Sequence, residues 1–168
     1  MKEIIINEDK LTEEEVNGVV KRAKLVVENS NGELLLVKCH GNCYLIGGHV
    51  DGEEEDNDTL IREIKEEAGI DYDPKVGEPF YSIKYYCRDY PDDGKNTKYI
   101  SNYYAVKYDL VPNIDNVNLT EDEAEGNFQL VYIAKDEILN EMNEILKTCT
   151  RKNVVKDTIA VIEEYLNK

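Results

Sequence analysis

The sequence predicts an α/β protein in which a mixed β-sheet is layered against helices. Two observations support this class. Strand-like segments with β-branched, partly alternating residues lie on both sides of a segment with helical periodicity, and two further helical segments follow the last strand. The chain has 168 residues, of which 41% are hydrophobic, and this is enough to bury one full core. We therefore expect a single domain over residues 1–168.

The first part of the chain is expected to form an arm and a β-hairpin. Residues 1–17 are predicted to contain a short strand and then a helical turn with Thr12 and Glu15 in a capping box. Strands are expected at residues 19–27, 33–38 and 44–46. The first two flank the turn Asn29–Gly32 and form a hairpin. Gly47 and Gly48 are expected to form a turn after the third strand.

A helix is expected after this turn. Its apolar stripe consists of Leu60, Ile61, Ile64 and Ala68. Asn57 or Asp58 is predicted to cap its start, and Gly69 fits the left-handed residue that ends a helix.

The second half of the chain contains more strands and two final helices. Strands are expected at residues 79–88, 98–110 and 128–133, with a polar loop at 89–96 and an acidic loop at 113–127. C-terminal helices are expected within 136–168, the first capped by Asp136 and running to Lys147, the second covering Asn153–Leu166.

Three glutamates on the central helix are the first sign of chemistry. Glu63, Glu66 and Glu67 are spaced i, i+3 and i+4, so their carboxylates share one patch of helix surface. Like charges repel at this spacing, and the helix dipole disfavours anions near a C-terminus. In a chain with 36 acidic residues a solvated acidic face would be ordinary. A bound cation would remove both penalties.

A longer pattern surrounds these glutamates. Gly48, Glu54 and the run from Arg62 to Ile70 fit G-x5-E-x7-R-E-U-x-E-E-x-G-U at every fixed position, where U is a bulky aliphatic residue. The segment 48–70 therefore resembles the Nudix box of the Nudix (MutT-like) hydrolases. It departs from the commonest form of the box before Glu54, where Gly52 comes one residue early, so the turn into the helix is expected to differ.

The resemblance implies a fold, a metal and a reaction. The Nudix fold is an α/β/α sandwich with a mixed sheet. Glu63, Glu66, Glu67 and the Gly48 carbonyl would bind Mg2+ or Mn2+, and Arg62, paired with Glu54, would hold the glutamates in place. The ion would assist hydrolysis of a nucleoside diphosphate linked to another group. The base in some members comes from outside the box, and here Glu125 is the first candidate and Glu123 the second.

The substrate stays open among dinucleoside polyphosphates, ADP-ribose, nucleotide sugars and nucleoside triphosphates. Tyr85 and Tyr86 lie near a position at which some family branches carry tyrosine, which favours dinucleoside polyphosphates over ADP-ribose. Eight of the twelve tyrosines and several cations occur between residues 79 and 110. From this region we expect phosphate or base contacts, with a minority of the tyrosines stacking on a base; the interleaved cations are Lys84, Arg88, Lys95, Lys98 and Lys107.

Three other readings compete with the hydrolase. A non-catalytic Nudix-like domain would sense a nucleotide metabolite, but such domains usually lose box glutamates and none is missing here. The acidic run 51–58 suggests a cation buffer, yet it lacks the glycine of an EF-hand loop. Cys39, His40 and Cys43 form half of a zinc site with no second pair.

Charge and composition limit the partners. The net charge of −16 opposes long nucleic acids and anionic membranes, and a small polyphosphate substrate would need cations in the site. No segment is apolar enough to span a bilayer or to act as a secretory signal, and the four cysteines show no disulfide spacing. We expect a cytoplasmic protein, with the arm or the last helix available for a homodimer.

Overall fold

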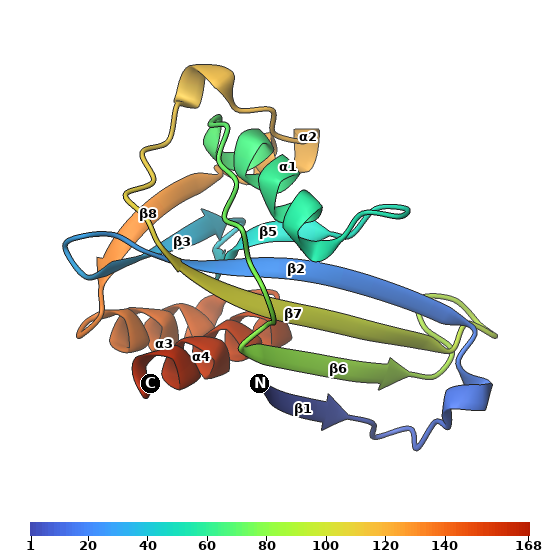
Figure 1. Ribbon diagram of the computed structural model, residues 1–168. Helices are drawn as coiled ribbons and strands as arrows, with labels where there is room; N and C mark the ends of the chain where they lie inside the picture. Colours follow the sequence, from blue (N-terminus) through green and yellow to red (C-terminus); the bar gives the residue numbers. More distant parts are fainter.

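The computed structural model describes residues 1–168 and contains one mixed sheet of eight strands with helices on both faces (Figure 1). The strands are β1 (Lys2–Ile6), β2 (Gly18–Glu28), β3 (Glu33–Cys39), β4 (Asn42–Tyr44), β5 (Ile46–His49), β6 (Tyr81–Cys87), β7 (Thr97–Lys107) and β8 (Gln129–Ala134). The helices are α1 (Asp56–Ala68), α2 (Glu121–Glu125), α3 (Ile138–Thr148) and α4 (Lys152–Leu166), with short 3-10 turns η1 (Glu13–Glu15) and η2 (Ile114–Asn116). The α/β class is confirmed.

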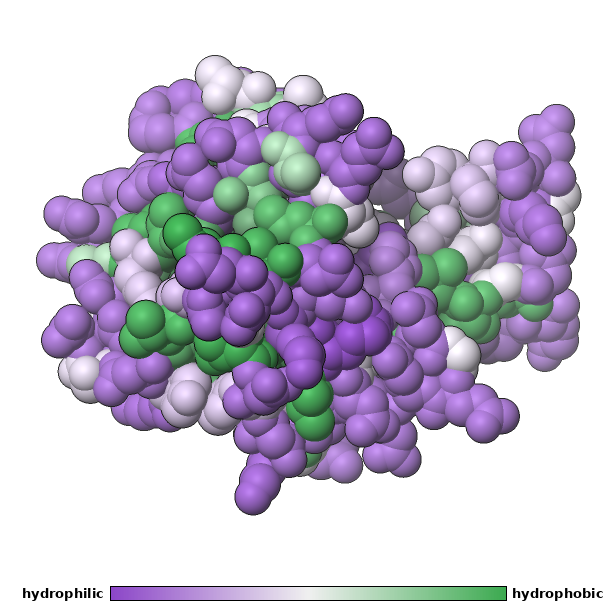
Figure 2. All heavy atoms as spheres, turned by 90° about the horizontal axis from the view of Figure 1, so that it is seen from above, coloured by the Kyte–Doolittle hydropathy of each residue, from purple (hydrophilic) through white to green (hydrophobic).

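The long strand β2 is the centre of the sheet. The strand order is β1-β6-β7-β2-β3-β4, with β5 paired to β2 and β8 paired to β3. β2 runs parallel to β7 along its whole length, and its other edge is shared between β5 and the end of β3. β1 is parallel to β6, and the remaining pairs are antiparallel. The arm is therefore part of the sheet, and the ends of β2, β6 and β7 next to it project to one side of the main body (Figures 1 and 2).

Strand alternation divides the core into two layers. Successive side chains of a strand point to opposite faces, so Ala23, Leu25 and Val27 of β2 pack against α1, whereas Val26 faces α3 and α4. Hydrophilic residues cover most of the outer face seen in Figure 2. Cys39 and Cys43 lie in different layers, so they do not share a site. No helix combines the length and apolar composition that crossing a bilayer requires.

Four local expectations are wrong. Gly47 and Gly48 lie inside β5, paired with Lys24 and Ala23, and do not form a turn. Helix α1 is capped by Glu55, because Glu55 and Asp58 form a capping box.

The other two lie in the second half of the chain. Helix α3 is capped at Glu137, one residue later than the Asp136 expected. The acidic loop 113–127 contains η2 and the short helix α2. Gly69 does end α1, at a φ of 70°, and Thr12 and Glu15 do form a capping box.

Candidate active site

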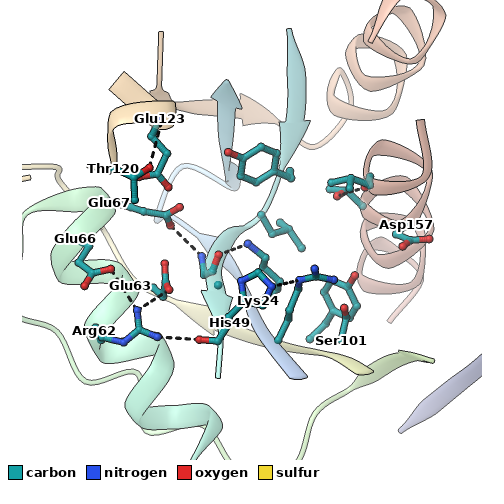
Figure 3. Close-up of a pocket in the computed structure, with 18 of the residues that line it drawn as sticks. Lys24, His49, Arg62, Glu63, Glu66, Glu67, Ser101, Thr120, Glu123 and Asp157 are labelled. Atoms are coloured by element: carbon teal, nitrogen blue, oxygen red, sulfur yellow. Dashed lines mark hydrogen bonds and ion pairs between the residues drawn. The ribbon is translucent and has the colours of Figure 1, made fainter. Parts of the chain in front are cut away.

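Helix α1 brings the three glutamates of the box to one edge of the sheet. Leu60, Ile64 and Ala68 are fully buried against the sheet, which fixes the rotation of the helix. Glu63, Glu66 and Glu67 then face β5 and the cavity beside it (Figure 3). The acidic patch is therefore partly buried rather than a solvated face, and Glu67 is only 4% exposed.

Arg62 is hydrogen-bonded to several carboxylates of this patch. Its guanidinium donates to both carboxylate oxygens of Glu54, at 2.9 and 3.1 Å, as expected from the sequence. It also donates to Glu63 at 2.7 Å, to Glu66 at 3.3 Å and to the backbone carbonyl of His49 at 2.8 Å. Bidentate pairing of this kind is strong and directional. The hydrogen bonds from Arg62 lower the pKa of Glu54 to about 2.

Burial makes two of the glutamates unusual. It raises the pKa of Glu67 to about 8, although the Gly47 N–H donates to this carboxylate at 3.0 Å. It also raises the pKa of Glu63. Lys24 of β2 lies nearby, partly buried, and donates to the Gly47 carbonyl, and desolvation lowers the pKa of its ammonium. These carboxylates and this ammonium are groups whose charge is costly without a partner.

The two glycines of β5 are required for different reasons. A Cβ at Gly48 would lie 2.1 Å from the Glu63 Oε1 atom, so the backbone there runs directly against the carboxylate. Gly47 has a φ of 116°, and a Cβ there would lie 2.3 Å from the Ala23 carbonyl oxygen of β2. Gly48 makes room for a functional side chain, and Gly47 makes room for the neighbouring strand.

A cavity of about 620 Å3 opens beside the glutamates and continues to helix α4. Acidic side chains line both of its ends. The carboxylates of α1 lie at one end, and Asp157 of α4 lies at the other, across from them in Figure 3. Three cations also line the cavity: Arg22, Lys24 and Arg151. Arg22 donates to His49 Nε2 at 3.3 Å and stacks over Tyr99.

The sequence-predicted residues fall into two groups. Gly48, Arg62, Glu63, Glu66 and Glu67 all line the cavity together. Helix α2 brings Glu123 and Thr120 to the cavity, but Glu125 is exposed and does not line it. The Glu123 carboxylate accepts hydrogen bonds from the N–H and hydroxyl of Thr120, at 2.8 and 3.0 Å. Of the two candidates named from the sequence, Glu125 first and Glu123 second, only Glu123 lines the cavity.

The cations expected to contact substrate lie elsewhere. None of Lys84, Arg88, Lys95, Lys98 and Lys107 lines the cavity. Most are paired with acids: Lys84 with Glu3, Lys98 with Glu13, Arg88 with Glu15, and Lys107 with Glu28. They hold the arm and the sheet together instead.

The cations that do line the cavity were not predicted from the sequence; they are Arg22, Lys24 and Arg151. Two cations at alternating positions in the apolar strand β2 were the available signal.

The donor set fits a divalent cation in its chemistry. Carboxylate and carbonyl oxygens are the hard ligands that Mg2+ and Mn2+ prefer, and a bound cation would favour the charged form of the buried Glu67 carboxyl group. No three acidic side chains surround a single point as they stand, since Arg62 holds Glu63 and Glu66 and the Gly47 N–H holds Glu67.

Comparison with known proteins gives a consistent result. The NUDIX domain family model matches residues 20–150. No curated protein matches the chain. Among solved structures, a NUDIX hydrolase from Nitrosomonas europaea is similar with a TM-score of 0.56 and 18% identity, covering 89% of this chain and 88% of that one. The MutT protein from Methanosarcina mazei Go1 is similar with a TM-score of 0.53 and 16% identity, covering 90% and 98%. The E. coli ORF135 protein has a TM-score of 0.53 and 19% identity, covering 89% and 90%. At these identities the structures show a shared fold.

Proposed function

The chain belongs to the Nudix hydrolase family, whose members act on pyrophosphate bonds, and from this premise we propose that it uses Mg2+ or Mn2+ to hydrolyse a nucleoside diphosphate linked to another group. The observation that carries the proposal is that acidic and basic side chains line neighbouring parts of the same cavity. Partly buried carboxylates of α1 lie at one end, and fixed cations of β2 lie next to them. A pyrophosphate placed between them would have its charge balanced by the ion held on the carboxylates on one side and by the cations of β2 on the other.

The box residues would hold the ion. Glu63, Glu66, Glu67 and the Gly48 carbonyl supply the oxygens, and Arg62 keeps the carboxylates of Glu63 and Glu66 oriented. A bound Mg2+ or Mn2+ would neutralise charge that develops on the phosphate oxygens and favour deprotonation of an attacking water. The role of the chain is to fix these oxygens in a partly closed cavity.

Glu123 is the residue we propose as general base, in place of Glu125. Its carboxylate lines the cavity, and the N–H and hydroxyl of Thr120 both donate to its Oε2 atom. These bonds orient the group while Oε1 stays available to accept a proton from water. Glu125, two residues further along α2, has no access to the cavity.

Arg22 and Lys24 are proposed to bind phosphate oxygens on the side away from the glutamates. Lys24 has three N–H donors, and the structure uses one of them, on the Gly47 carbonyl. Its ammonium lies over the Tyr44 ring, 5.3 Å from the ring centre. The remaining donors are available to a ligand in the cavity, and a phosphate there would offset the cost of burying the ammonium.

A panel of substrates tests the proposal. Purified protein would be incubated with Mg2+ or Mn2+ and with dinucleoside polyphosphates, ADP-ribose, nucleotide sugars or nucleoside triphosphates, and the products would be separated by chromatography. We expect a nucleoside monophosphate as one product from the preferred substrate, and complete loss of turnover with EDTA. The Glu66→Gln variant, which removes one of the proposed ligand charges from the half-buried patch on α1, should lower turnover.

Absence of turnover across the panel, with metal binding retained in calorimetry, would contradict the proposal and favour a nucleotide-sensing domain. Turnover that survives EDTA would contradict the metal assignment. We also propose a cytoplasmic location, because all four cysteines are free thiols.

A further inference from the structure

The turn between β3 and β4 contains three polar residues that the proposed hydrolysis does not use: Cys39, His40 and Asn42. The backbone N–H of His40 donates to the Gly126 carbonyl at 2.8 Å. Its Nε2 atom lies 2.8 Å from the Asp122 carbonyl oxygen and 3.3 Å from Asp122 Oδ1. A carbonyl oxygen only accepts, so Nε2 carries a proton and donates it to this hydrogen bond. His40 therefore binds α2 near its start and at its end.

The side chain of His40 also packs directly against the end of α2. A Cβ at Gly126 would lie 2.4 Å from His40 Cδ2 and 2.5 Å from Cys39 Sγ. The φ of Gly126 is −76°, which alanine adopts without strain, so the contact and not the backbone requires glycine here. Cys39 Sγ lies 3.8 Å from the Glu123 carbonyl oxygen. Outside residues 113–128, α2 and Gly126 form hydrogen bonds only with this turn.

Asn42 fixes the turn from its other side. Its side chain is buried, and the amide nitrogen donates to the His40 carbonyl at 3.1 Å. The amide oxygen accepts a hydrogen bond from the Arg151 N–H at 2.8 Å. Arg151 directly precedes α4, and Asn42 pairs with Cys39 across β3 and β4. The turn therefore joins α2 to the sheet and to the start of α4.

The position of α2 matters because Glu123 reaches the cavity from this helix (Figure 3). Thr120 orients the Glu123 carboxylate, but Thr120 belongs to the same segment. Their hydrogen bonds therefore do not fix the carboxylate relative to the glutamates of α1. Helix α2 has only five residues, which is too short for a helix to be stable without outside contacts. The β3–β4 turn supplies these contacts.

We propose that His40 is a positioning residue, which holds α2 where Glu123 acts as general base. This role rests on the proposed function of Glu123. Loss of the His40 side-chain hydrogen bond would loosen α2 and move the Glu123 carboxylate. The glutamates of α1 and the cations of β2 would stay in place, because none of them contacts the turn. The effect should therefore fall on kcat and not on KM.

His40→Leu and His40→Gln are a matched pair of variants. Both keep a Cβ at a position whose φ is 49°, but only glutamine can donate to the Asp122 carbonyl. We expect His40→Leu to lower kcat by about 10-fold with little change in KM, and His40→Gln to recover most of kcat. Gly126→Ala should cause a similar loss, because its Cβ pushes against the His40 ring. Glu121→Gln, an exposed change on α2 outside the cavity, should leave kcat unchanged.

A double-mutant cycle separates positioning from a general loss of structure. If His40 acts through Glu123, His40→Leu should cause no further loss of kcat in the Glu123→Gln background. An equal loss in both backgrounds would overturn the proposed role. Unchanged kcat in His40→Leu, or a loss that His40→Gln does not recover, would overturn it as well.

Amide hydrogen exchange of residues 121–128 tests the same contact without substrate. We expect faster exchange in His40→Leu than in the wild type, and exchange close to the wild type in His40→Gln. Equal exchange in all three proteins would overturn the role of His40. Faster exchange in His40→Leu, with no turnover in the wild type, would support the contact between His40 and α2 and contradict the hydrolase.

Discussion

Gly48→Ala is expected to lower turnover strongly while leaving the fold nearly unchanged. A Cβ at this position would lie 2.1 Å from Glu63 Oε1 and 2.4 Å from Glu63 Cδ. Nonbonded carbon atoms approach one another to about 3.5 Å, so the overlap exceeds roughly 1 Å. The backbone of Gly48 does not have a positive φ, so alanine itself fits the strand. The end of the Glu63 side chain is the part that has to move.

The cost of this movement follows from the contacts of Glu63. Rotation of its carboxylate breaks the 2.7 Å ion pair with Arg62, whose side chain is 28% exposed. A charge-assisted hydrogen bond of this exposure contributes about 1 kcal/mol to the free energy of unfolding. The effect on chemistry is larger, because displacement of a ligand by about 1 Å lowers turnover on the order of 10^2-fold.

Gly47→Ala is the matched control, since it is a neighbouring glycine with a different obstacle. The Cβ would lie 2.3 Å from the Ala23 carbonyl oxygen, a backbone atom of β2 that has no rotamer to change, and the φ of 116° is unfavourable for alanine. We expect a loss of several kcal/mol in urea unfolding for Gly47→Ala, against about 1 kcal/mol for Gly48→Ala. Normal kcat/KM in Gly48→Ala, or equal destabilisation by both changes, would refute the placement of Glu63.

Three further predictions concern single acidic residues. Glu67→Gln should lower turnover on the order of 10^2-fold or more, with weaker Mn2+ binding by electron paramagnetic resonance, because a ligand charge is lost; near-normal rates would contradict the assignment. Glu123→Gln should lower kcat at saturating metal by about 10-fold or more, whereas Glu125→Gln should not, and the opposite ranking would restore Glu125 as the base. Glu28→Gln should lower the free energy of unfolding at pH 7 by about 1–3 kcal/mol, since it weakens the pair between the buried Glu28 carboxylate and the partly exposed Lys135. The hydrogen bond from Lys135 lowers the pKa of Glu28, so this stabilisation is present above the unfolded pKa and lost as pH falls through the folded pKa; urea curves of both proteins should converge in acid.

The glutamate end of the site could be predicted because its determinants are local. Glu63, Glu66 and Glu67 share a helix, and the spacing of Leu60 and Ile64 fixes which face is buried. The pairing of Arg62 with Glu54 also spans only eight residues. None of this requires knowledge of the sheet.

The other end of the cavity depends on long-range pairing. Arg22 meets Ser101, and Lys24 meets Tyr103, only because β2 and β7 pair in parallel at one register. Asp157 reaches the same cavity from a helix that packs across the sheet. A shift of the register by one residue would turn each of these side chains to the opposite face. Sequence periodicity does not contain that register, so Arg22, Lys24 and Asp157 were not predicted.

The choice between Glu123 and Glu125 was predictable in principle. Thr120 and Glu123 form the T-x-x-E pattern of a capping box, which indicates a helix start within the acidic loop. The structure contains this box, with Glu123 bonded to Thr120. In a helix, residues two positions apart do not share a face, so the same pattern separates Glu123 from Glu125.

The net charge of −16 suggested that an anionic substrate would be repelled unless metal ions were already bound. The structure shows that this repulsion is offset locally, because three cations line the same cavity as the glutamates: Arg22, Lys24 and Arg151. Electrostatic attraction over a few ångströms in a partly closed cavity is stronger than repulsion from exposed charges, which salt screens beyond about 10 Å. Metal ions are therefore needed to balance the glutamates and to assist the chemistry, while fixed cations of the chain already favour phosphate on the opposite side. It follows that a nucleotide should retain measurable affinity when metal is removed, and that Lys24→Met should weaken this metal-free binding of a nucleoside monophosphate in calorimetry. Equal metal-free affinity in Lys24→Met and wild type would mean that Lys24 does not bind the phosphate and that metal ions alone offset the repulsion.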